Sequence, residues 1–168
     1  LWIGKFFSYK NPQLFVNLAI QFPNQNFIMI GGPTNSKLFT KIYGESIEIE
    51  NLTVVGSVPH REIGKYIGIS KILINFSTVE GFPNVFLEAW GDGLPVLSNK
   101  FDPDGVIEKY NLGFCATSYS ELVSKLQTFL DNPQLMGVFE KTTKDYVQKY
   151  HSLNEIADKY ELFIDSLL

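Results

Sequence analysis

Apolar residues along the chain fall into two alternating patterns. Short apolar runs bounded by Gly, Pro or Asn predict buried strands, and the stretches between them repeat apolar side chains every three or four positions, as amphipathic helices do. Helices are predicted after Asn11-Pro12, at about 36–47 and 60–68, from Pro83, after Ser118, and at about 133–150 and 154–168. Six runs predict strands: Leu1–Gly4, Phe27–Ile30, Leu52–Val55, Ile72–Ile74 with Phe76, Pro95–Ser98 and Gly113–Ala116.

Strands that alternate with helices in this way indicate an α/β fold. We expect a three-layer, Rossmann-like domain, with a parallel sheet of about six strands and helices on both faces. If the strand order is 3-2-1-4-5-6, strands one and four are neighbours, and the crevice between the loops that follow them is the expected ligand site. Those loops are Lys5–Lys10 and Ser77–Phe82.

The segment from Ile72 to Gly93 has the order strand, loop, helix that forms anion sites. Pro83 suits the first turn of a helix, whose free amides and dipole favour a phosphate in the preceding loop. Glu80 lies in that loop, and Glu88 lies on the helix, one turn beyond Asn84. Together with two lysines in the opposite loop, these positions predict a site for a diphosphate flanked by hydroxyl-bearing groups.

Composition and charge exclude several classes of function. The chain has 168 residues, is 45% hydrophobic and carries a formal net charge of −4, which argues against nucleic acid as a partner. Its apolar runs are shorter than the roughly 20 residues of a membrane span, and its single cysteine fits a reducing compartment, so we expect a cytoplasmic protein. The chain lacks an initiator Met, and we expect one domain, residues 1–168, cut from a longer protein.

Other motifs favour plain structural roles. The chain contains neither the dinucleotide fingerprint nor the P-loop. Asp102-Pro103-Asp104 matches the D-x-D of metal-dependent sugar transferases, but its Pro and the following Gly favour a turn in which Asp104 caps the next helix. The two histidines have no partners at metal-ligand spacing, so we expect no metal. An acid and base pair of a glycosidase stays an alternative for Glu80 and Glu88.

The same stretch resembles a known family. The run from Glu80 to Ala89, followed by Gly93-Leu94-Pro95-Val96, resembles the E-x7-E segment of retaining GT-B glycosyltransferases of the family-4 type. Gly4-Lys5 and Lys10 are similar to that family's G-[RK]-x4-K loop, and Gly31-Gly32 and Gly56–Pro59 fall where it has glycine turns. The resemblance covers nearly the whole chain and corresponds to the donor-binding C-terminal half, without the N-terminal acceptor half.

The resemblance implies a role for each matching residue. Lys5 and Lys10 would bind the donor phosphates, and Glu80 would contact the transferred sugar. Glu88 would hold the ribose hydroxyls, and Ser57 and Val58 would lie near the base. The remaining implied contacts are mainly backbone, from Gly4 beside the lysines, from Gly81, Phe82 and Pro83 near the sugar, and from the amides of Asn84 and Val85 at the diphosphate.

Three positions depart from the family pattern. Lys5 stands where many members have Arg, which exchanges a bidentate partner for a point charge. Lys71 stands where Asp is frequent. The segment Asp102–Gly105 replaces a glycine-rich acidic loop, so the distal contacts of the sugar do not follow from the resemblance.

The function implied is that of the donor domain of a retaining, metal-independent glycosyltransferase. The donor would be a UDP-, GDP- or ADP-sugar with no cofactor, and this half alone is expected to bind donor but to transfer little or nothing. Any peripheral contact with the inner membrane surface would come through the absent half. An epimerase of similar architecture and a non-catalytic binding module are the alternatives. A paired histidine and acid would favour the epimerase, and the sequence shows none near the motif.

Overall fold

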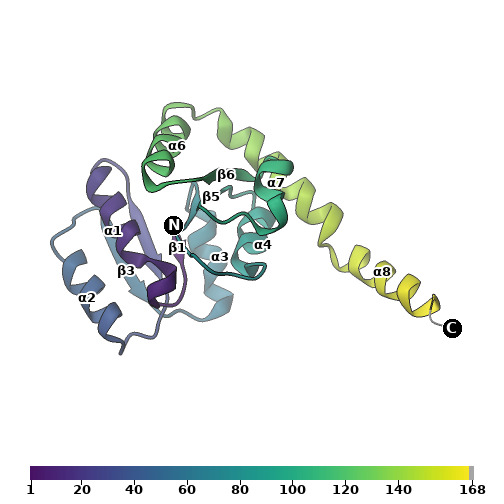
Figure 1. Cartoon of the computed structure of the whole chain (residues 1–168), viewed down its shortest axis with the longest axis horizontal. Coiled ribbons are helices and arrows are strands. Elements are labelled where there is room, and N and C mark those ends of the chain that lie inside the picture. Colours follow the sequence, from purple (N-terminus) through teal and green to yellow (C-terminus); the bar gives the residue numbers. More distant parts are fainter. Residues whose placement is uncertain (167–168) are drawn as a thin grey trace.

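The computed structural model describes residues 1–166, in which short strands alternate with helices (Figure 1). The predicted strands all form, with bounds within two residues of those expected: β1 (Trp2–Ile3), β2 (Phe27–Ile30), β3 (Leu52–Gly56), β4 (Leu73–Asn75), β5 (Val96–Asn99) and β6 (Gly113–Ala116). The longer helices are α1 (Pro12–Gln21), α2 (Lys37–Ser46), α3 (His60–Gly68), α4 (Asn84–Gly91), α6 (Tyr119–Asp131), α7 (Leu135–Tyr150) and α8 (Leu153–Asp165), and the short ones are η1 (Ser8–Lys10), η2 (Pro103–Gly105) and α5 (Val106–Lys109).

The strands form two parallel three-stranded sheets, in the orders β1-β2-β3 and β4-β5-β6, rather than the single six-stranded sheet expected from the sequence. The two sheets meet at Leu1, whose nitrogen donates to Ile72 O at 3.0 Å and whose oxygen accepts from Ile74 N at 2.8 Å. Leu1 directly precedes β1, which is only two residues long. Both bonds come from this single residue, so no strand ladder joins β1 to β4. The spatial sequence 3-2-1-4-5-6 is nevertheless the expected one.

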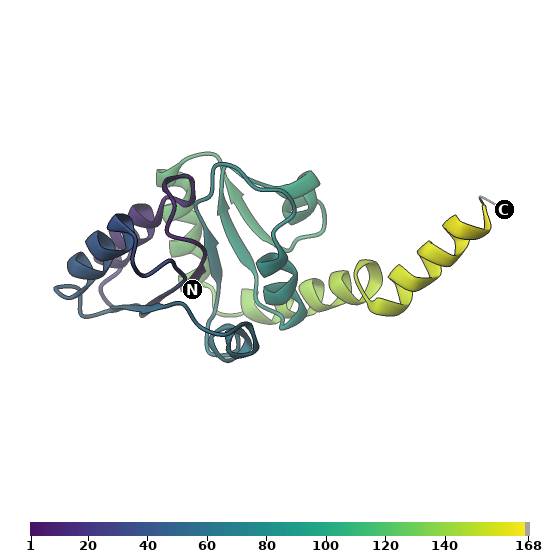
Figure 2. The same cartoon turned by 90° about the horizontal axis from the view of Figure 1, so that it is seen from below.

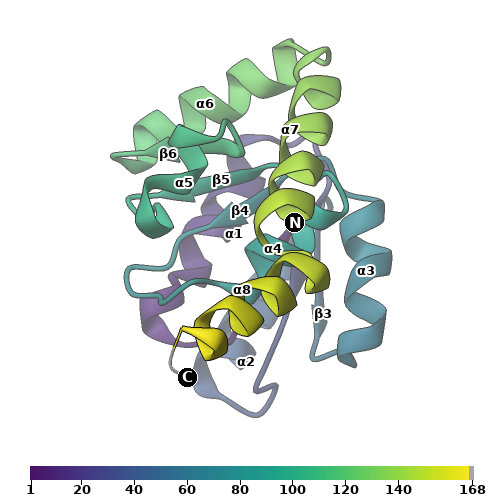
Figure 3. The ribbon, with the colours of Figure 1, turned by 90° about the vertical axis from the view of Figure 1, so that its right-hand side faces the viewer.

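Helices cover both faces of the strands, and each face has its own hydrophobic cluster. One cluster joins α1, α2 and α6 and includes Phe15, Ile42 and Leu122. The other joins α3, α4 and α5 and includes Ile63 and Trp90. Figure 3 shows α3 on the side of the strands opposite α1 and α6. This three-layer arrangement confirms the predicted fold class.

The turn after β5 is capped by a different residue from the one predicted. Asp102, rather than Asp104, accepts from Ile107 N at 2.8 Å and from Glu108 N at 3.2 Å. Asp104 lies in a left-handed conformation with φ of 52°, inside the turn that Asp102 closes. The prediction that Asp104 caps the next helix was therefore wrong, because the carboxylate two residues earlier reaches the free amides of α5 first.

The last helix, α8, extends away from the rest of the molecule (Figures 1 and 2). Its exposed apolar side chains include Tyr160, Leu162 and Phe163. Among the described residues no helix combines the length and the apolar character that crossing a membrane requires.

Candidate functional site

The loops after β1 and β4 lie against each other, as the predicted strand order requires. Tyr9 O accepts from Thr78 N at 2.9 Å. The side-chain amide of Asn11 donates to Phe76 O at 2.9 Å, across 65 positions of sequence. Asn11 reaches this geometry because its backbone is left-handed, with φ of 46°, a conformation that Asn tolerates better than most residues. These bonds hold the lysine loop beside the first glutamate.

A cavity of about 550 Å³ opens at this end of the strands. It lies at the carboxyl ends of β1, β2 and β3 and at the start of α4, where open α/β folds bind ligands. Its walls hold these ten predicted site residues: Gly4, Lys5, Lys10, Ser57, Val58, Glu80, Pro83, Asn84, Val85 and Glu88. The sequence therefore located residues that form one concave surface, although they come from three separate loops and from helix α4.

Two predicted residues do not line the cavity. Gly81 faces open space, with no atom within 4 Å of the position that a Cβ would take. The ring of Phe82 packs edge-on against Trp90, with the ring centroids 6.3 Å apart, and also lies 5.6 Å from the ring of His151. Phe82 thus anchors the start of α4 to the core, and its side chain points away from the cavity.

Two residues from the two loops form an ion pair within the cavity wall. Lys10 Nζ donates to Glu80 Oε1, and the side chains are only 17% and 15% exposed. Lys5 differs, because it is exposed and its ammonium group lies 5.9 Å from the centre of the Phe7 ring. The cavity therefore has one lysine held by a carboxylate and a second one that faces solvent.

Helix α4 supplies backbone donors on the opposite wall. Pro83 is its N-cap residue, with φ of −72°, and Phe86 N already bonds Pro83 O at 3.0 Å. The first amide groups of a helix have no partner within the helix, so those of Asn84 and Val85 are available to an anion in the cavity. The polar wall of α4 and the lysine loop thus face one cavity from two sides.

Glu88 lies one turn into α4 and contacts a residue that the sequence analysis did not select. Its Oε1 lies 3.0 Å from His60 Nε2, a ring that is 82% exposed. The expectation that no histidine pairs with an acid near the motif was therefore wrong. His60 and Glu88 are 28 positions apart and meet because α3 begins where the loop after β3 reaches the cavity. The only sequence signal for His60 was that it directly follows Gly56–Pro59.

The described residues contain no group of three or more His, Cys, Asp and Glu side chains that could hold a metal ion. Cys115 lies outside the cavity wall. Partial burial, together with the nearby carboxylates of Asp102, Glu108 and Glu121, raises the pKa of its thiol to about 11. A protonated thiol is a poor nucleophile.

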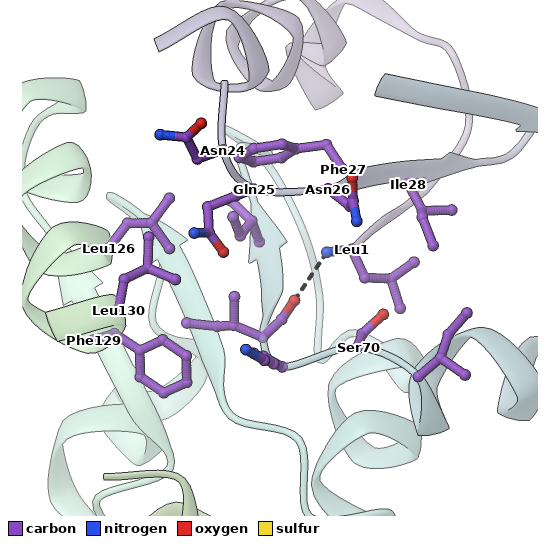
Figure 4. Close-up of a pocket in the computed structure, with 14 residues that line it drawn as sticks. Leu1, Asn24, Gln25, Asn26, Phe27, Ile28, Ser70, Leu126, Phe129 and Leu130 are labelled. Atoms are coloured by element: carbon purple, nitrogen blue, oxygen red, sulfur yellow. Dashed lines mark hydrogen bonds between the residues drawn. The ribbon is translucent and has the colours of Figure 1, made fainter. Parts of the chain in front are cut away.

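A smaller cavity, of about 240 Å³, lies at the opposite end of the strands (Figure 4). It is lined by the loop before β2 and the loop before β4, and apolar side chains of α6 close one side of it. The bond between Leu1 N and Ile72 O crosses it. None of the predicted site residues lies there.

The model of one protein family, glycosyl transferases group 1, matches residues 1–146. A curated relative, the alpha-monoglucosyldiacylglycerol synthase of Acholeplasma laidlawii, is 26% identical over 145 residues, which are 83% of this chain and 36% of the relative. A glycosyltransferase 1 domain-containing protein of Xenopus tropicalis is 27% identical over 84% of the chain and 41% of its own length. The chain thus spans about two fifths of these relatives.

Solved structures share the fold at low sequence identity. HepE from Anabaena in complex with UDP superposes with a TM-score of 0.82 at 16% identity, covering 98% of this chain and 48% of that one. The same protein was also solved with UDP-glucose, with a TM-score of 0.80. The C-terminal domain of LpcC, a glycosyl transferase group 1 family protein of Francisella tularensis, gives a TM-score of 0.72 at 20% identity, with coverage of 90% and 85%.

Proposed function

Because the chain belongs to the glycosyl transferases group 1, we propose that its cavity binds the nucleotide-sugar donor of a glycosyl transfer. The observation that carries the proposal is the meeting of Lys10, Glu80 and Glu88 with the first turn of α4 around one cavity. Cationic side chains and helix amides suit a diphosphate, and carboxylates on either side suit the hydroxyl groups of two sugars.

The donor would lie across the cavity in a defined direction. Its diphosphate would sit between the lysine loop and the amides of Asn84 and Val85. The ribose would then reach Glu88, and the base would lie near Ser57 and Val58, which are on the same side of the cavity as His60. The transferred sugar would lie at the other end, beside Glu80.

We propose a retaining transfer that needs neither metal nor cofactor from this half of the enzyme. When the bond between the anomeric carbon and the diphosphate breaks, negative charge develops on the diphosphate oxygens. Lys5, Lys10 and the α4 amides are placed to stabilise that charge, which lowers the barrier without a proton-transfer group. The acceptor would attack from the face that the diphosphate leaves, and it would be held by a domain that these residues do not supply.

UDP-sugars are the first donors to test, because HepE, which shares the fold, was solved with UDP and with UDP-glucose. The matched relatives are more than twice as long as this chain, so we propose that the chain is their donor-binding half. On its own this half would bind donor with little or no transfer.

Calorimetric titration of the 168-residue chain with UDP-, GDP- and ADP-sugars tests the proposal. We expect one nucleotide to bind, and we expect Glu88→Ala and Lys10→Ala to weaken its binding about ten-fold or more, since each removes a charge-assisted hydrogen bond. Glu161→Gln, on the exposed face of α8, removes one charge outside the cavity and should bind like the wild type. Failure to bind any nucleotide sugar would refute the proposed function.

The contact of His60 with Glu88 is the one observation that bears on the epimerase alternative. In the proposed pose of the donor this pair would contact the ribose and the transferred sugar would lie beside Glu80, so the pair would not act on that sugar. Conversion of a nucleotide sugar by the full-length protein without acceptor, followed by NMR, would instead favour an epimerase.

A further inference from the structure

We propose that Lys10 and Glu80 neutralise each other through their ion pair, and that this makes the site prefer a nucleotide sugar over a free nucleoside diphosphate. The inference rests on the proposed function and assigns the preference to two residues. Glu80 would control whether the charge of Lys10 is available to the diphosphate, in addition to contacting the sugar.

The ion pair is held in place from both sides. Lys10 ends the loop after β1, and Glu80 lies in the loop after β4. The bond from Thr78 N to Tyr9 O, at 2.9 Å, joins these loops next to the pair. At 17% and 15% exposure the two side chains are largely shielded from water, so their attraction is stronger than that of a surface pair.

This pairing lowers the affinity of the cavity for a bare diphosphate. A lysine ammonium group has three N–H donors, so a phosphate oxygen can approach Lys10 while the pair is intact. The carboxylate of Glu80 then lies beside the phosphate and repels it, which offsets the attraction from Lys10. The α4 amides and the solvent-exposed Lys5 would supply most of the remaining attraction.

A sugar attached to the diphosphate changes this balance. Its hydroxyl groups are donors, and one of them can replace the N–H of Lys10 at the Glu80 carboxylate. Lys10 is then free to direct its charge at the diphosphate. Once the sugar has been transferred, the carboxylate regains Lys10 and the hold on the remaining nucleoside diphosphate weakens. The pair would thus favour entry of donor and release of product.

A double-mutant cycle tests the proposal on the 168-residue chain. Inorganic pyrophosphate, UDP and the tightest-binding nucleotide sugar are titrated by calorimetry against the wild type, Glu80→Gln, Lys10→Met and the double variant. We expect Glu80→Gln to bind pyrophosphate and UDP about ten-fold more tightly, which is the effect of one charge-assisted hydrogen bond released to the ligand. We expect a clearly smaller gain when Met replaces Lys10, because only the direct repulsion by Glu80 is then relieved. We also expect a smaller advantage of the nucleotide sugar over UDP in Glu80→Gln.

Two results would overturn the inference. An equal gain in the Lys10→Met background would mean that Glu80 acts only as a negative charge near the phosphates. Unchanged or weaker pyrophosphate binding by Glu80→Gln would mean that the pair does not restrain Lys10. Glu161→Gln serves as the charge-matched control, and thermal unfolding checks that each variant is folded during the titration. Pyrophosphate has neither nucleoside nor sugar, so its result tests the pair even if no nucleotide sugar binds, an outcome that would refute the proposed function instead.

Discussion

Replacing Gly31 with Ala is expected to force the lysine loop away from the end of β2. Gly31 has a φ of 153°, which residues with a side chain rarely adopt, and a Cβ at this position would lie 1.6 Å from the carbonyl oxygen of Gly4. Real Cβ contacts are essentially never shorter than 3.0 Å, so the Gly4 backbone must move by more than an ångström. Gly4 begins the loop that carries Lys5 and Lys10.

The cost of this movement follows from the bonds on either side of the clash. Gly4 N donates to Ile30 O at 2.9 Å, and Phe6 N donates to Gly32 O at 2.7 Å. Losing both removes about 1 kcal/mol each, and the unfavourable backbone conformation of Ala adds about 1–3 kcal/mol. The expected loss in unfolding free energy is therefore about 4 kcal/mol, a large part of the 5–15 kcal/mol typical of a domain of this kind.

Urea unfolding, followed by the fluorescence of the buried Trp2 and Trp90, measures this loss. Gly81→Ala is the matched control, because the same methyl group there meets open space in a neighbouring loop. Gly31→Ala is also expected to bind nucleotide sugar more weakly under conditions where it remains folded. An unfolding free energy for Gly31→Ala within about 0.5 kcal/mol of that for Gly81→Ala would refute the reasoning.

Three further predictions concern other parts of the molecule. The side-chain nitrogen of Asn51 lies 2.8 to 3.0 Å from the carbonyl oxygens of Ala19, Phe22 and Gln25, at the end of α1 and in the turn after it. Asn51→Ala should therefore lower the unfolding free energy by about 2 kcal/mol in urea titrations, and an unchanged midpoint would contradict this. Asp102→Ala should cost about 1 kcal/mol through loss of the α5 cap, whereas Asp102→Asn should cost less; equal losses would argue against capping. Since burial and nearby carboxylates raise the pKa of Cys115 from 9.0 to about 11, its alkylation by iodoacetamide should keep accelerating from pH 9 to pH 11, and a rate that levels off near pH 9 would contradict this. The native state binds more protons than the unfolded state in that interval, so Cys115 should also make the fold less stable as pH rises through it.

Most of the fold could be predicted from local pattern, because the strands are short runs rich in apolar residues and glycine follows several of them, as Gly4 follows β1 and Gly31 follows β2. Phe27–Ile30 and Gly113–Ala116 were predicted with the bounds that the structure has. The division into two sheets could not be predicted, since it depends on how β1 and β4 pair at Leu1. The cap at Asp102 was also missed, because Asp102 and Asp104 are equally plausible caps until the path of the turn is known.

Which residues form the site was also partly predictable from local sequence pattern. Glycine and proline mark the loops at the carboxyl ends of the strands, and the strand order brings those loops together. The direction of individual side chains was not predictable. Phe82 turns into the core against Trp90, and His60 reaches Glu88 from another helix.

The sequence by itself determined the order of strands and helices, the start of a helix directly after Pro83 and the two loops that carry lysine and glutamate. These depend on interactions between residues close in the chain, such as apolar periodicity and the restricted backbone of proline. Only the tertiary structure decided which charged groups meet. Lys10 and Glu80 are 70 positions apart, and whether they pair depends on the bonds that hold one loop against the other. A charged side chain in such a loop can face water or pair with an opposite charge, and the packing of the loops against each other decides which.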